Sequence, residues 1–122
     1  MFSETLLEHF QAPRNSGEMP DADAEAEDEN PVCGDRLRVW LRIRDGRIAQ
    51  ATWMAEGCAP AIAAASVMSE LVRGMSLEEA RQLDRETIEE ALGGLPARKR
   101  HAAILAASVV RSAVERYETN RG

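Results

Sequence analysis

The segment RLRVWLRIR, residues 36–44, most constrains what this chain can fold into. Its side chains alternate strictly, and every second position holds an arginine except for the central Trp40. A period of two predicts a β-strand that buries one face and exposes the other. The exposed face carries the arginines and Trp40, and the buried face carries four aliphatic residues: Leu37, Val39, Leu41 and Ile43.

An acidic stretch before this strand alternates in the same way. Alanines separate its acidic residues, which are Asp21, Asp23, Glu25, Glu27 and Glu29. The stretch is either a strand with one polar face or a solvated charged linker. We favour the strand, because acids opposite the arginines form favourable cross-strand pairs. Asp45-Gly46 is a hairpin turn signal, so residues 47–56 return as a third strand, completing a three-stranded antiparallel meander.

The rest of the chain carries helix signals, which include apolar periodicity, capping residues and helix-ending glycine or proline. They predict helices at residues 3–11, 59–74, 76 to about 83, 84–93 and about 97–117. The expected fold class is therefore α+β, with a three-stranded antiparallel sheet packed with about five helices. At 122 residues the chain is long enough for a hydrophobic core, and we expect a single domain over residues 1–122.

Composition excludes several classes of partner. The net charge is −6 and the pI about 5.0, so no nucleic-acid surface is expected. No apolar run reaches the roughly 20 residues that cross a membrane, and the first residues do not resemble a secretory signal. Two cysteines do not make a disulfide framework, so we expect a reducing, cytoplasmic location in which both thiols are free.

The stretch NPVCGD places Cys33 and Asp35 around a sharp bend. Pro31 and Gly34 are the residues that shape such a bend. Cys58 comes directly after the third predicted strand and directly before a helix. In a meander the start of strand two and the end of strand three meet at one end of the sheet. The two cysteines, 25 positions apart, are therefore expected close together in space.

A free cysteine is ordinarily a small buried hydrophobic residue. Two of them in glycine-flanked turns at one sheet end, with Asp35 beside Cys33, favour a metal or thiolate site instead. By itself His101 is typical of a surface histidine, and we expect His9 to titrate in solvent. If His101 faces the cysteine turns, the set becomes Cys33, Asp35, Cys58 and His101. Two thiolates, an imidazole and a carboxylate can bind zinc tetrahedrally or ligate an iron–sulfur cluster.

Four segments, in this order, resemble the NifU N-terminal / IscU / SufU family of iron–sulfur cluster assembly scaffolds over nearly the whole chain. They are SETLLEHFQAPRNSG, NPVCGDRL, EGCAPAIAAASVMSELVRGMSLEEA and LPARKRHAAILAASVV. The resemblance implies a small antiparallel sheet covered by helices, with ligands on loops at one end. It also implies a non-enzymatic scaffold that transiently binds a [2Fe-2S] cluster. A cysteine desulfurase would supply sulfur, and recipient apo-proteins would take the cluster.

The same resemblance implies roles for individual residues. Cys33, Cys58 and His101 would be cluster ligands. Asp35 would be a fourth ligand or the residue that makes the cluster labile enough to pass on. A carboxylate is a harder ligand than a thiolate and binds an iron–sulfur centre more weakly, which gives that role a physical basis.

The last segment departs from the family pattern Leu-Pro-Pro-Val-Lys-x-His-Cys. Four positions match: Leu95, Pro96, Lys99 and His101. Ala102 stands at the cysteine position, or, in a SufU-type alignment, His101 itself takes that position; in both cases the third thiol is missing. Ala97 and Arg98 replace the Pro-Val pair of the segment to which a specialised Hsp70 chaperone docks. Chaperone docking is therefore not carried over.

Two other functions remain open from the sequence. In the first, the same four residues hold Zn2+, and the chain is a sulfur-transfer partner or regulator of a cysteine desulfurase. In the second, the chain is an interaction module that binds no metal. One chain offers only two thiolates. A cluster could therefore be bound by a single chain or be shared by two chains of a homo-oligomer.

Overall fold

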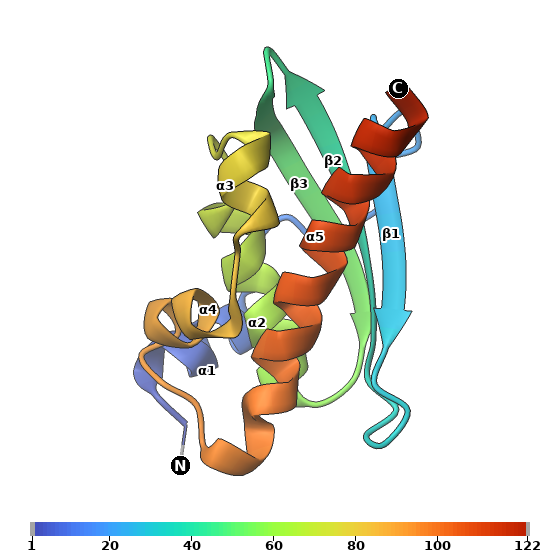
Figure 1. Ribbon diagram of the computed structural model, residues 1–122. Helices are drawn as coiled ribbons and strands as arrows, with labels where there is room; N and C mark the ends of the chain where they lie inside the picture. The colour runs from blue at the N-terminus through green and yellow to red at the C-terminus, as the bar shows by residue number, and fades with distance from the viewer. Residues whose placement is uncertain (1, 122) are drawn as a thin grey trace.

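A three-stranded antiparallel sheet lies at the centre of the computed structural model, which describes residues 2–121 (Figure 1). Strands β1 (Ala24–Glu29), β2 (Arg36–Arg44) and β3 (Arg47–Glu56) lie side by side in chain order. The hairpin between β2 and β3 turns at Asp45 and Gly46, whose φ angles of 53° and 73° suit a tight two-residue turn. The predicted meander is confirmed.

The two faces of β2 differ as the alternation predicted. Its four aliphatic side chains are at most 5% exposed and face the helices. Its arginines point to the other side, where each pairs with an acid of β1 or of the segment before it. The pairs are Arg36–Glu29, Arg38–Glu25, Arg42–Asp21 and Arg44–Asp23, with N–O distances of 2.8–3.4 Å. The acidic stretch therefore contributes a strand, as expected.

Trp40 shares this arginine face, yet only 5% of it is exposed. The guanidinium of Arg38 lies 4.9 Å from the centre of its ring, a distance at which the cation and the ring attract each other. The segment between the first helix and β1 also passes across this side of the sheet (Figure 1). The face that alternation marked as exposed is thus partly covered.

Helices cover the opposite face of the sheet (Figure 1). The core contains many fully buried alanines, whose small side chains let helix and sheet backbones approach closely. None of the helices in the described part of the chain is long and apolar enough to cross a membrane. The helical elements are α1 (Glu4–Gln11), α2 (Ala59–Leu71), α3 (Leu77–Arg81), α4 (Arg85–Ala91), the short 3-10 helix η1 (Ala97–Lys99) and α5 (Arg100–Arg121).

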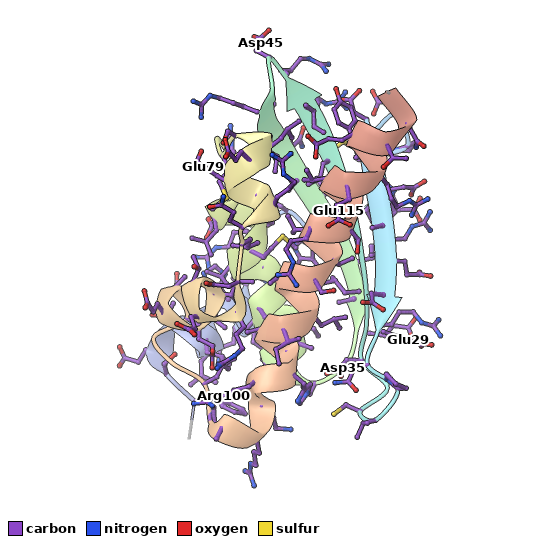
Figure 2. The ribbon with its side chains drawn as sticks, viewed as in Figure 1. Glu29, Asp35, Asp45, Glu79, Arg100 and Glu115 are labelled. Atoms are coloured by element: carbon purple, nitrogen blue, oxygen red, sulfur yellow. The ribbon has the colours of Figure 1, made fainter. Side chains whose placement is uncertain are left out.

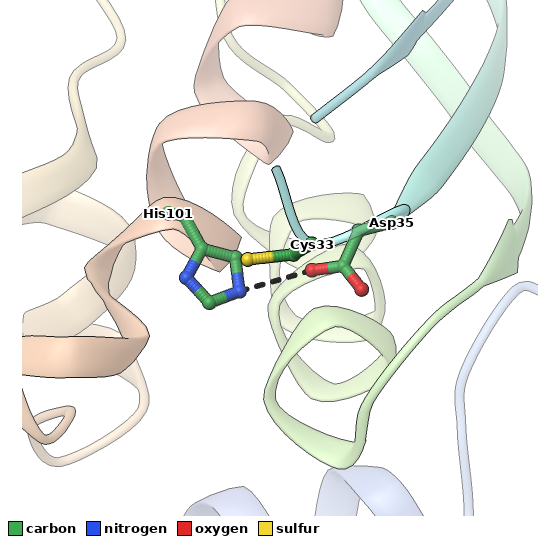
Figure 3. Close-up of side chains that lie close together, drawn as sticks. All are labelled: Cys33, Asp35 and His101. Carbon is green, nitrogen blue, oxygen red and sulfur yellow. Dashed lines mark ion pairs between the residues drawn. The ribbon is translucent and has the colours of Figure 1, made fainter. Parts of the chain in front are cut away.

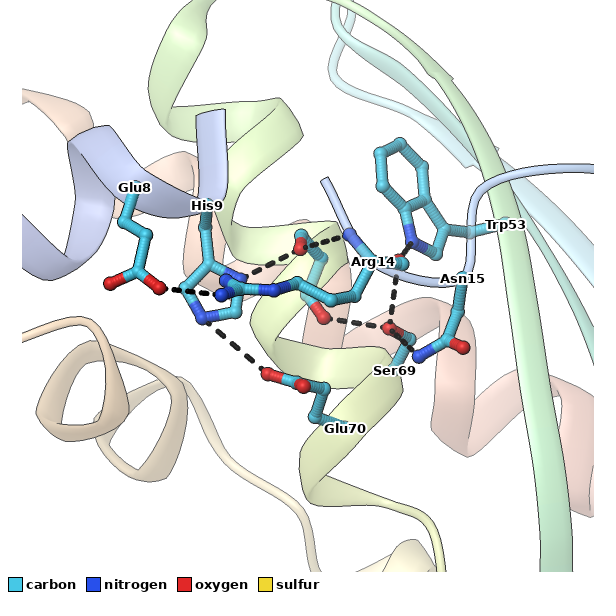
Figure 4. A network of polar contacts seen from close by, with 8 residues as sticks. Glu8, His9, Arg14, Asn15, Trp53, Ser69 and Glu70 are labelled. Carbon is cyan, nitrogen blue, oxygen red and sulfur yellow. Dashed lines mark hydrogen bonds and ion pairs between the residues drawn. The ribbon is translucent and has the colours of Figure 1, made fainter. Parts of the chain in front are cut away.

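The expectation that His9 titrates in solvent is wrong. His9 is 5% exposed, because α1 packs its inner face against α2. Its Nδ1 lies 2.7 Å from the hydroxyl oxygen of Ser66, which also accepts a hydrogen bond from the backbone N–H of Arg14 at 2.9 Å (Figure 4). A hydroxyl group can accept two hydrogen bonds and donate one, so Ser66 joins the Arg14 N–H to His9 Nδ1 with either tautomer of the imidazole.

The turn after α1 is fixed by the same network. The backbone carbonyl of Arg14 accepts hydrogen bonds from the Trp53 indole at 2.8 Å and from the Ser69 hydroxyl at 3.2 Å (Figure 4). The Asn15 amide donates to Ser69 at 3.1 Å. The Pro-Arg-Asn turn therefore joins α1 to α2 and to β3.

Candidate functional site

Three segments far apart in the sequence meet at one end of the molecule. They are the β1–β2 loop, the start of α2 and the start of α5. Asp35 and Arg100 lie toward this end, whereas Asp45 of the β2–β3 turn lies at the opposite end (Figure 2). The prediction that the two cysteine turns lie at the same sheet end is confirmed.

The β1–β2 loop bends through a compact hydrogen-bonded turn. The side-chain oxygen of Asn30 accepts from the backbone N–H groups of Val32 at 3.0 Å and Cys33 at 3.4 Å. The N–H of Gly34 donates to the Asn30 carbonyl at 2.7 Å, and Gly34 has a φ of 75°, which favours glycine. This turn leaves Cys33 exposed. Asn30 was not among the residues predicted from the sequence to shape this bend, although an Asn-Pro pair is a recognised turn signal.

Asp35 is the centre of the site and is only 3% exposed. Its Oδ1 accepts a hydrogen bond from the backbone N–H of Cys58 at 3.3 Å, and its Oδ2 lies 3.9 Å from the Cys58 thiol. Cys58 is the N-cap residue of α2, and its own side chain makes no capping hydrogen bond. The carboxylate of Asp35 therefore lies at the positive end of the α2 dipole.

His101 reaches the same carboxylate from the first turn of α5. Its Nε2 lies 3.0 Å from Asp35 Oδ2 (Figure 3). The two atoms are close but not aligned as a hydrogen bond, so Nε2 is a buried nitrogen without a hydrogen-bond partner. Buried polar atoms in native proteins are ordinarily satisfied. A buried imidazole nitrogen without such a partner, beside a carboxylate and a thiol, is suited to ligate a metal.

Cys33, Asp35 and His101 form the tightest ligand set. One ligand atom from each lies within 4.8 Å of the others. Around a tetrahedral metal with bonds of 2.0–2.3 Å the ligand atoms are about 3.3–3.8 Å apart, so a small inward movement of the exposed Cys33 closes the set. Cys58 lies outside this trio but touches it through Asp35.

The structure thus brings together the residues predicted from the sequence, three of them tightly and Cys58 at the edge. Their donor atoms are two sulfurs, one imidazole nitrogen and carboxylate oxygens. This mixed set suits borderline and soft metals such as zinc and iron rather than magnesium or calcium. Ligation by these residues stays a prediction.

The whole chain, residues 1–122, matches the NifU-like N terminal domain. It is 41% identical over 122 residues to iron-sulfur cluster assembly scaffold protein IscU 1 of Archaeoglobus fulgidus, covering 100% of this chain and 80% of that protein. It is 34% identical over 129 residues to iron-sulfur cluster assembly scaffold protein IscU of Escherichia coli, covering 98% and 96%. The crystal structure of a nitrogen-fixing NifU-like protein (N-terminal) from Brucella abortus shares the fold, with a TM-score of 0.77, 21% identity and coverage of 96% and 94%. By sequence over its full length and by fold, the chain belongs to the NifU-like N-terminal domain family.

Proposed function

We propose that this protein is an iron–sulfur cluster assembly scaffold that transiently binds a [2Fe-2S] cluster and passes it to recipient apo-proteins. One observation carries the proposal: a thiol, a carboxylate and a half-buried imidazole converge within 4.8 Å, with a second thiol beside them. Relatives that are named as scaffolds and match 98–100% of this chain support it. Cys33, Cys58 and His101 act as ligands, and Asp35 acts as the fourth ligand or as the group that keeps the cluster exchangeable.

The exposure of the site supports a cargo rather than a permanent cofactor. Cys33 stands in solvent on a hairpin loop, so a recipient protein can reach a cluster bound there. Asp35 contributes a hard oxygen ligand among softer ones, which weakens its hold on an iron–sulfur centre. Both features favour release over permanent retention.

The missing third thiol limits how the cluster is held. Ala102 is 2% exposed and belongs to the hydrophobic core, one residue after His101. The cluster would therefore depend on two thiolates, with the nitrogen and oxygen ligands completing the set. Sulfur delivered by a cysteine desulfurase would be accepted by Cys33 or Cys58, the two thiols of the chain.

A second function is favoured by how compact the trio is. Ligand atoms within 4.8 Å of one another suit a single tetrahedral ion, and Cys33, Asp35, His101 and Cys58 offer four donors of the kinds that zinc accepts. In this alternative the site holds Zn2+, and the protein is a sulfur-transfer partner or regulator of a cysteine desulfurase.

Two assays separate these functions. The iron- and sulfide-loaded protein is mixed with an apo-ferredoxin to measure cluster transfer, and the zinc-loaded protein is added to a cysteine desulfurase to measure its turnover. The scaffold proposal predicts transfer that Asp35→Asn changes and Asp45→Asn leaves unaltered. Asp45→Asn is the matched control, because Asp45 lies at the opposite end of the molecule and asparagine tolerates its φ of 53°. Desulfurase stimulation without any cluster transfer would replace the scaffold by the second function.

A further inference from the structure

Gly57 has no backbone reason to be glycine. The glycines at 17, 34, 46, 74, 93 and 94 all have positive φ angles, a conformation that side chains other than glycine rarely adopt. Among the glycines between residues 2 and 121, Gly57 alone lies outside that region. Its missing side chain therefore has another explanation.

That explanation is the carboxylate of Asp35. A Cβ at Gly57 would lie 2.4 Å from Asp35 Oδ1 and 3.0 Å from Asp35 Cγ. It would also lie 3.2 Å from the Cβ of Ala61, a tight contact that a small shift relieves. Real Cβ atoms essentially never lie within 3.0 Å of a non-bonded atom, so either the carboxylate or the backbone has to move.

Asp35 cannot move without leaving the site. It is held on one side by the backbone N–H of Cys58 at 3.3 Å and approached on the other by His101 Nε2 at 3.0 Å. It is also 3% exposed, so protein atoms surround it on nearly every side. Moving Oδ1 away from residue 57 breaks the Cys58 hydrogen bond and turns Oδ2 away from His101.

We propose that Gly57 is a positioning residue of the metal site. Without a Cβ, it leaves the space in which the Asp35 carboxylate rests against the start of α2, within reach of Cys33, Cys58 and His101. This inference rests on the proposed function, because it takes those residues to be metal or cluster ligands. It adds that the residue at position 57 determines whether Asp35 can take part in metal binding.

The test uses Co2+ alone as the probe, because its visible spectrum reports tetrahedral geometry and thiolate ligation. Cobalt affinity and spectrum are measured for the unsubstituted protein, Gly57→Ala, Asp35→Ala and the double variant. Loss of a group that orients metal ligands lowers metal affinity about 10- to 100-fold, and we expect this loss in Gly57→Ala together with an altered spectrum. Asp35→Ala removes the atoms that the new Cβ would strike. In that background Gly57→Ala should change affinity by no more than about twofold, because non-additivity marks residues in contact.

A purely structural role for Gly57 gives different results. Unchanged cobalt affinity and spectrum in Gly57→Ala would overturn the inference, as would an equal loss of affinity with and without Asp35. If Gly57→Ala alone fails to fold, the inference requires the double variant to fold, and failure of both overturns it. An unsubstituted protein that binds no cobalt overturns this inference, whereas the proposed function is tested separately by reconstitution with iron and sulfide. Binding that Gly57→Ala leaves intact overturns this inference alone.

Discussion

Replacing Ser66 by alanine tests the network that joins α1 to the rest of the protein. Ser66 is fully buried, and its hydroxyl joins two partners, the backbone N–H of Arg14 and Nδ1 of His9. Alanine keeps the shape of the residue and the α2 helix but removes both hydrogen bonds. The Arg14 N–H and His9 Nδ1 are then left without this partner.

The magnitude follows from these two groups. Leaving one buried polar group unsatisfied costs about 1–3 kcal/mol. The Arg14 contact is only partly buried, so the sum for the pair is about 2–4 kcal/mol of unfolding free energy. For 122 residues each kcal/mol lowers Tm by about 4 °C, and the expected decrease is therefore about 8–16 °C.

Thermal and urea unfolding followed by circular dichroism measure this loss at neutral pH. Ser112→Ala, at a half-exposed serine of α5, is the matched control, and it should stay within about 0.5 kcal/mol of the unsubstituted protein. A Ser66→Ala variant as stable as that control would refute the network as a source of stability.

Three further predictions concern stability and the missing thiol. Burial, aided by the charge of Arg14, lowers the pKa of His9 below its usual 6.5, so the folded state favours neutral His9. The resulting stability is complete above pH 6.5 and declines as the pH falls below it, and urea titrations should show this decline in the unsubstituted protein but less of it in His9→Gln. Leu41→Ala, at a fully buried position of β2, should lower the free energy of unfolding by about 2–5 kcal/mol, and a loss below 1 kcal/mol would contradict the assigned core. Ala102→Cys adds a thiol beside His101 and should raise the iron and sulfide retained per chain after reconstitution; an unchanged yield would show that this position does not reach the site.

Alternation in β2 predicted the sheet correctly because its two faces meet different surroundings. The apolar side chains at every second residue pack against the hydrophobic core. The arginines between them pair with acids of β1 and of the segment that precedes it. Trp40 shows the limit of the pattern. Periodicity placed it on the exposed face, but its burial depends on Arg38 and on a crossing segment that no local pattern describes.

The site was predictable in outline because topology alone brings the two cysteine turns to one end of the sheet. Which ligand side chains contact one another was not predictable, because it depends on how the helices pack against the sheet. Cys33 lies with Asp35 and His101, while Cys58 lies at the edge of the set. The buried His9 was missed because its partner Ser66 is 57 positions away. Gly57 looked like an ordinary turn glycine until the position of Asp35 was known.

We propose that Cys33, Cys58, Asp35 and His101 form one site for an iron–sulfur cluster. Anaerobic reconstitution with iron and sulfide, followed by absorbance spectra and by iron, zinc and acid-labile sulfide analysis, tests it most directly. We expect a visible charge-transfer spectrum with matched iron and sulfide in the unsubstituted protein, and we expect it to be lost in Cys33→Ala and in Cys58→Ala. Tightly held zinc without a cluster, or a cluster that survives both substitutions, would contradict it.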